Sequence, residues 1–196
     1  MKKVLNLVLA ALLVVSMALP VFAESAESVR QTGAPTVAEV EDKTVTVTVT
    51  SMLDQDKASW EVKQEMQAAA ESLGEGDLTQ VQSIQTAVAA LNEKNAAEAT
   101  GEEAPEEIKT ENLVVSEVFH VDASQAGVAI TFEAEGIKAG QFLMVMVFVD
   151  GEWVILDTEK VEILEDGKVR IIFENYGTVA FVVDKNEAAA AVAANA

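Results

Sequence analysis

The sequence predicts a mainly β (α+β) fold, an antiparallel β-sandwich of about eight strands with a two-helix hairpin inserted after the first strand. Two observations support this fold class. Short β-prone segments recur between turn signals such as Asp150-Gly151 and Asp166-Gly167, and this regular spacing is typical of sandwiches. Residues 54–94, in contrast, place their apolar residues at helical spacing.

The first 23 residues have the pattern of a secretory signal peptide. Two lysines precede a long apolar run, Pro20 breaks that run, and a V-x-A cleavage site ends at Ala23. We therefore expect cleavage after Ala23 and export, so that the protein is secreted or associated with the cell envelope. The polar residues 24–43 contain a glycine and a proline, and we expect them to form a flexible leader.

The predicted sandwich domain covers residues 44–184. In its first strand, residues 44–50, valines alternate with threonines, which gives the strand one dry and one wet face. The β pattern returns after residue 112, and the Ala-rich tail 185–196 is expected to be disordered. The predicted strands are residues 44–50, 113–121, 128–134, 141–149, 152–157, 160–164, 168–174 and 178–184.

The helical insertion, residues 54–94, contains two amphipathic helices with a short connection, which predicts an antiparallel helical hairpin. The acidic residues 95–112 include a glycine and a proline, and we expect them to form a solvated loop that leads back to the sheet. The apolar stripes of the two helices are Val62, Met66, Ala69 and Leu73, and then Val81, Ile84, Val88 and Leu91.

The segment 142–149 is apolar on both faces, although a strand of a plain antiparallel sandwich has one wet face. Asp150-Gly151 after it predicts a two-residue hairpin turn, because glycine readily adopts positive φ and aspartate tolerates it. The eight apolar residues are too few for a membrane helix, which needs about 20. We therefore predict that the helical hairpin packs on the outer face of the sheet that contains residues 141–157.

Composition and charge limit the classes of partner. No cysteine is present, so we expect neither disulfides nor a thiolate metal site. The formal net charge is −20, or −22 without the two lysines of the signal peptide, which argues against nucleic acid or anionic lipid as a partner. The charge is explained better by solubility than by binding of cations or basic partners. We expect a monomer with an unknown extracellular or cell-wall partner and no membrane span after signal cleavage.

No motif in the sequence carries catalytic chemistry. His120 is the only histidine, and no serine lies in a nucleophile-elbow context, so we expect no catalytic, cofactor-binding or metal-binding residue and no enzymatic activity. The acidic turns at Asp150 and Asp166 lack a calcium-loop pattern and are explained by turn formation.

Aromatic residues are the candidates for ligand contact. Core packing explains most of them better than a carbohydrate-stacking platform does. Tyr176 lies in a predicted turn, so we expect it to be partly exposed, and it is a weak candidate for a ligand contact. The six residues considered are Trp60, Trp153, Phe119, Phe173, Tyr176 and Phe181.

Three segments resemble a recurrent C-terminal β module: VSEVFHV, VFVDGEWVIL and GKVRIIFENYGTVAFVVD. This module is found in uncharacterised secreted and wall-attached proteins of Gram-positive, often gut-dwelling, bacteria. The resemblance covers roughly residues 40–184 and implies a fold more than a function, because its motifs are mainly hairpin and core residues.

The expected function is that of a secreted, non-enzymatic extracellular or cell-envelope domain, which binds an unknown ligand or acts as a structural accessory. The alternative is a cell-surface carbohydrate-active or carbohydrate-binding protein that uses acidic and aromatic residues. A cleft with two facing carboxylates and an exposed aromatic side chain would favour the alternative, whereas a convex and evenly charged surface would favour the first.

Overall fold

The structure, a computed structural model, describes residues 34–73, 78–98, 107–134 and 136–186. The nine strands of this part are β1 (Thr36–Val40), β2 (Val47–Ser51), β3 (Leu113–Ala123), β4 (Ala129–Glu133), β5 (Leu143–Val149), β6 (Glu152–Ile155), β7 (Val161–Ile163), β8 (Val169–Ile172) and β9 (Gly177–Asp184). The helices are α1 (Trp60–Ser72) and α2 (Gln82–Glu98), with the 3-10 turns η1 (Met52–Lys57), η2 (Leu78–Gln80), η3 (Thr110–Asn112) and η4 (Thr158–Lys160).

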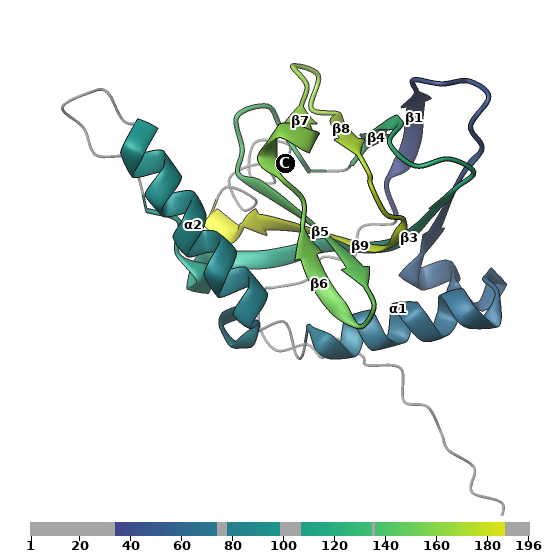
Figure 1. Ribbon diagram of the computed structural model, residues 1–196, viewed down its shortest axis with the longest axis horizontal. Coiled ribbons are helices and arrows are strands. Elements are labelled where there is room, and N and C mark those ends of the chain that lie inside the picture. Colours follow the sequence, from purple (N-terminus) through teal and green to yellow (C-terminus); the bar gives the residue numbers. More distant parts are fainter. Residues whose placement is uncertain (1–33, 74–77, 99–106, 135, 187–196) are drawn as a thin grey trace, which may run out of the picture.

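The strands form two antiparallel sheets, which confirms the predicted mainly β sandwich (Figure 1). The four-stranded sheet has the order β1-β4-β8-β7, and the five-stranded sheet has the order β2-β3-β9-β5-β6. The insertion that contains both helices separates β2 from β3 in the sequence, although these two strands are paired neighbours. The larger sheet has one strand more than the smaller, and Val154 on its edge strand β6 is half exposed.

A phenylalanine-rich core fills the space between the two sheets. Phe119 and Phe181 come from neighbouring strands of the larger sheet, and their rings meet edge to face with centroids 5.1 Å apart. Phe132 of the smaller sheet lies 5.8 Å from Phe119, so the aromatic contacts join the two layers. Val145 and Val147 of β5 belong to the same core, and all these side chains are almost completely buried.

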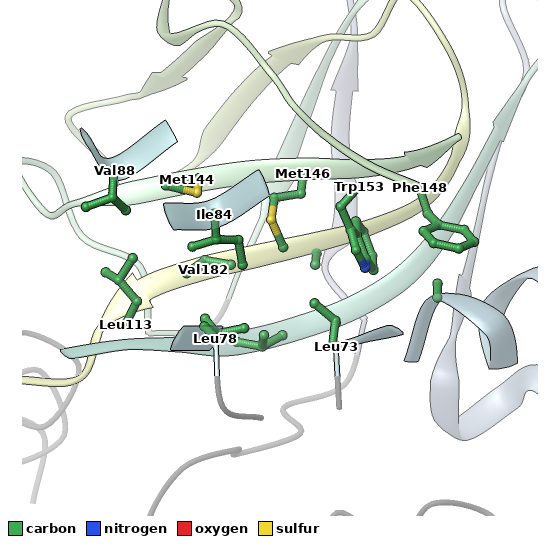
Figure 2. Packing of buried hydrophobic residues seen from close by; sticks show 13 residues of the cluster. Leu73, Leu78, Ile84, Val88, Leu113, Met144, Met146, Phe148, Trp153 and Val182 are labelled. Carbon is green, nitrogen blue, oxygen red and sulfur yellow. The ribbon is translucent and has the colours of Figure 1, made fainter. Parts of the chain in front are cut away.

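A second core lies between the larger sheet and the two helices (Figure 2). Met144, Met146 and Phe148 project from the opposite face of β5 and pack with Ile84 of α2 and Leu73 at the end of α1. Trp153 of β6 also packs here, and its Nε1 donates a hydrogen bond of 2.7 Å to the Ser72 hydroxyl. The predicted packing of the helices on the sheet is therefore confirmed, and it explains why β5 is apolar on both faces.

The turn between β5 and β6 confirms the predicted hairpin. Asp150 and Gly151 have φ values of 52° and 88°, and Val149 pairs with Glu152 across the turn. Asp150 is the only non-glycine residue with positive φ in the described part of the chain. This pair of left-handed residues matches the twist of the flanking strands.

Three predicted boundaries were wrong. The leader predicted as flexible over residues 24–43 contains β1, whose side chains are mostly exposed and which is held by backbone pairing with β4. The solvated loop predicted for residues 95–112 begins within α2, because its alanines continue the helix to Glu98, and it ends in η3. The tail predicted as disordered from residue 185 begins with an anchored residue, since Lys185 Nζ donates to the Glu111 carbonyl at 3.1 Å. The predicted signal peptide (1–23) and residues 187–196 of the predicted tail lie outside the described residues.

Candidate functional site

His120 lies in a polar cluster where α1 meets the larger sheet. The Glu65 Oε1 atom accepts hydrogen bonds from the backbone N–H and the hydroxyl of Thr178, at 2.7 and 2.9 Å. His120 Nδ1 lies 3.4 Å from the same oxygen and 3.5 Å from the Thr178 hydroxyl. Register brings this set together, because His120 of β3 pairs with Thr178 of β9. Of these residues only His120 stands out in the sequence, since Glu65 lies 113 positions before Thr178 and carries no motif.

The geometry of this cluster serves packing rather than nucleophilic catalysis. Thr178 has no exposed surface, so its hydroxyl is out of reach of a substrate. Its proton points to a carboxylate and not to a histidine that could act as a base. A Cβ atom at the neighbouring Gly177 would lie 2.8 Å from the Phe148 carbonyl oxygen and 3.0 Å from Glu65 Oε1, so the backbone of β5 comes too close for a side chain there.

Tyr176 is partly exposed, as predicted from its turn. Its ring packs against Phe173 with centroids 5.8 Å apart, and its hydroxyl donates a 2.5 Å hydrogen bond to the Gln125 carbonyl. Burial, and to a smaller degree the negative charge of Asp122, raises the pKa of the phenol. Both ends of the side chain therefore have partners within the fold, which weakens the candidacy of Tyr176 as a ligand contact.

The other aromatic candidates differ in their exposure to solvent. The core positions predicted for four of them are confirmed by side chains that are at most 6% exposed: Phe119, Trp153, Phe173 and Phe181. Trp60 differs, because 61% of its surface is exposed, and core packing was the wrong interpretation for this residue. It lies two positions before Val62 at the start of α1, and two residues turn a helix by about 200°, so it points away from the apolar stripe.

The exposed tryptophan belongs to a short exposed segment that we call the η1–α1 surface: Leu53, Asp54, Asp56, Trp60 and Glu61. Ser59 caps α1 by accepting a hydrogen bond from the Val62 N–H, which fixes Trp60 as the first helical residue. Leu53, in η1, is 66% exposed. This segment thus presents two large apolar side chains among carboxylates and the exposed Lys57.

Lysines neutralise part of the acidic charge at the η1–α1 surface. Lys57 Nζ lies 2.7 Å from Asp54 Oδ1, and Lys63 Nζ lies 2.5 Å from Asp56 Oδ1. The hydrogen bond from Lys63 lowers the pKa of the Asp56 carboxyl. Glu61 lies in the first turn of α1, where the helix dipole favours a negative charge.

A cavity of about 440 Å³ opens elsewhere, at the end of the smaller sheet. Its walls come from the residues before β1, the end of β4 and the turn between β7 and β8. Glu133 and Asp166 contribute carboxylates, and Lys168 forms a close ion pair with Asp166, whose pKa is lowered mainly by that hydrogen bond. Among the described residues that line the cavity none is aromatic, so these residues do not combine carboxylates with a stacking platform.

Within the described ranges, no group of three or more histidine, cysteine or acidic side chains is arranged to hold a metal ion. None of the helices between residues 34 and 186 that the structure describes is both long and apolar enough to cross a membrane. No protein-family model, curated protein or solved structure matches this chain.

Proposed function

We propose that this protein is a secreted, non-enzymatic domain of the extracellular space or cell envelope, which binds its partner through the η1–α1 surface. The observation that carries the proposal is the exposure of Trp60. Tryptophan has a large apolar surface and is enriched among the residues that dominate binding energy, so a tryptophan left in water by a well-packed fold marks a contact site. The resemblance to secreted and wall-attached proteins agrees with an envelope partner.

The polar clusters of the fold support a binding role over catalysis. Contacts among Glu65, His120 and Thr178 hold α1 on the sheet. The Tyr176 hydroxyl binds the Gln125 carbonyl and so holds the turn before β9 in place. The Trp153 indole likewise binds the end of α1 through Ser72. These groups are thus engaged in holding elements together, whereas Trp60 is left available at the surface.

Binding to isolated envelopes tests the proposal. Exported protein is incubated with envelope material of the producing cells, and the bound fraction is measured after sedimentation. We expect Trp60→Ala to weaken binding by about tenfold or more, as the loss of a central contact does. Val154→Ala is the matched control, because it also removes an exposed apolar side chain but lies on β6. Equal binding by the Trp60 variant and the wild type would contradict the proposal.

Carbohydrate binding is the second candidate, favoured by the carboxylates around Trp60. A sugar ring can stack on an indole while carboxylates accept hydrogen bonds from its hydroxyl groups. Asp54, Asp56 and Glu61 provide such acceptors six, four and one residues from the tryptophan in the sequence. Protease-treated envelopes separate the candidates, because a polysaccharide partner survives digestion and a protein partner does not.

Export is tested on the same samples. N-terminal sequencing of protein from the culture medium should begin with Glu24-Ser25, and a chain that keeps residues 1–23 would contradict the proposed processing.

A further inference from the structure

The four edge strands of the sandwich differ in how well they resist pairing with another chain. Charged residues, irregular pairing and short length discourage such pairing. β1 carries Glu39 next to a shift in register, β6 has four residues and begins with Glu152, and β7 has three residues with Glu162 at its centre. β2 has five residues, but its sequence VTVTS carries no charge and its register with β3 is regular.

The backbone of β2 presents hydrogen-bonding groups on its outer side. The Ser124 N–H donates to the Thr46 carbonyl, so Thr46 belongs to a hydrogen-bonded pair with β3. Such pairs alternate along an antiparallel ladder, which makes Thr48 and Thr50 the next inward-bonding residues and turns the backbone groups of Val47 and Val49 outward. Among the strands that the structure describes, none pairs with β2 on that side.

The sequence around β2 is self-complementary. Residues 46–50 read TVTVT, which is the same in both directions about Thr48. If two copies meet antiparallel about a two-fold axis at Thr48, Val47 of one copy faces Val49 of the other, and Thr46 faces Thr50. Valine then opposes valine and threonine opposes threonine, which are favourable cross-strand pairs.

We propose that a second copy of this chain pairs with β2 about this axis, which joins the two five-stranded sheets into one continuous sheet. This goes beyond the binding function proposed for the η1–α1 surface and replaces the monomer expected from the sequence. Because the strand has only five residues, the interface is small, and the dimer should form at micromolar or higher concentrations.

Charge opposes the dimer without preventing it. Each exported copy carries a net charge of −22 if residues 1–23 are removed, so the copies repel each other. Asp122 of β3 pairs with Thr48 of β2, so in the dimer it would lie about three strand spacings, or about 14 Å, from Asp122 of the second copy. This distance exceeds the Debye length of about 8 Å at physiological ionic strength. Added salt should therefore strengthen the association, whereas it would weaken an interface built on ion pairs.

Sedimentation velocity over a range of concentrations tests the association. Val49→Pro removes an outward-facing N–H without breaking a bond to β3, and proline is tolerated at that kind of edge position. Val49→Ala is its matched control, because it also trims the valine side chain but keeps the N–H. We expect wild type and Val49→Ala to dimerise with salt-enhanced affinity and Val49→Pro to bind at least about tenfold more weakly.

A single introduced cysteine tests the register, since the chain has none of its own. Residues opposed in a non-hydrogen-bonded antiparallel pair have Cα atoms about 4.5 Å apart, which allows a disulfide. Thr48→Cys should therefore form a covalent dimer under mild oxidation. Thr46→Cys, also exposed, should not, because its two copies would lie about 14 Å apart along the strands.

The proposal stays testable even if Val49→Pro folds poorly, because the wild type and the cysteine variants report on the dimer independently of that variant. A wild-type monomer at all concentrations and salt levels would overturn the proposal, as would equal association by the proline and alanine variants. Equal crosslinking at positions 46 and 48 would overturn the two-fold axis at Thr48.

Discussion

Replacing Glu65 with alanine should loosen α1 from the sheet. The carboxylate accepts two hydrogen bonds from Thr178, whose donors are buried, and the shortest is 2.7 Å. Hydrogen bonds to a charged group contribute about 1.5–3 kcal/mol each to stability. The Glu65 side chain is 36% exposed, so water can replace part of what is lost. Two bonds at the lower end of this range contribute about 3 kcal/mol, and solvent access lowers that figure, so we expect the free energy of unfolding to fall by about 2–3 kcal/mol.

Urea unfolding followed by tryptophan fluorescence measures this loss. In a thermal unfolding experiment, the same loss of free energy should lower the melting temperature by about 4–12 °C for a domain of this size. Glu65→Gln keeps an acceptor oxygen in place and should lose less than half as much stability. Glu71→Ala removes an exposed carboxylate from the same helix and should stay within about 0.5 kcal/mol of wild type. If Glu65→Ala is no less stable than Glu71→Ala, the cluster does not hold the helix as described.

Two further predictions concern the phenol and the helix-covered core. Because the chain has one tyrosine, phenolate absorbance reports Tyr176 alone, and its midpoint should lie above the usual pKa of about 10 in the folded protein and return to that value in urea. Because the pKa of Tyr176 is higher in the folded than in the unfolded state, the phenol contributes stability that is fully present below the unfolded-state pKa. This contribution is lost as the pH rises through the folded-state pKa, so Tyr176→Phe should remove that part of the alkaline pH dependence. Ile84→Ala truncates a fully buried contact between α2 and the sheet and should cost about 2–5 kcal/mol in urea unfolding, whereas the exposed Thr86→Ala should change stability by less than about 1 kcal/mol. A phenol that titrates normally, or an Ile84 variant as stable as the Thr86 variant, would contradict the respective contact.

The sequence predicted the parts of the fold that rest on local signals. Asp150-Gly151 identified the hairpin because its backbone demands are local, and the helical stripes identified the faces that cover β5. β1 could not be identified in this way. Its side chains are nearly all exposed, so no alternation of apolar residues marks it, and only its long-range pairing with β4 makes it a strand.

The polar cluster and the exposed tryptophan differ in how far they could be predicted. The contact between Glu65 and Thr178 depends on where a helix crosses a sheet, and no local pattern encodes that position. Trp60 could have been found, because its offset from Val62 places it opposite the apolar stripe.

The double coverage of β5 has a consequence for strand alignment. In most half-buried strands, a slip of one residue is prohibitive because it moves polar side chains into the core. β5 offers apolar side chains to both layers, so a slip would exchange its methionines and phenylalanine for valines without exposing a polar group to either layer. Its alignment must therefore come from the difference in side-chain size and from the turn at Asp150-Gly151. A substitution that abolishes positive φ at Gly151 would then yield a mixture of shifted sheets instead of one weakened native state, visible as doubled NMR signals from β5 and β6.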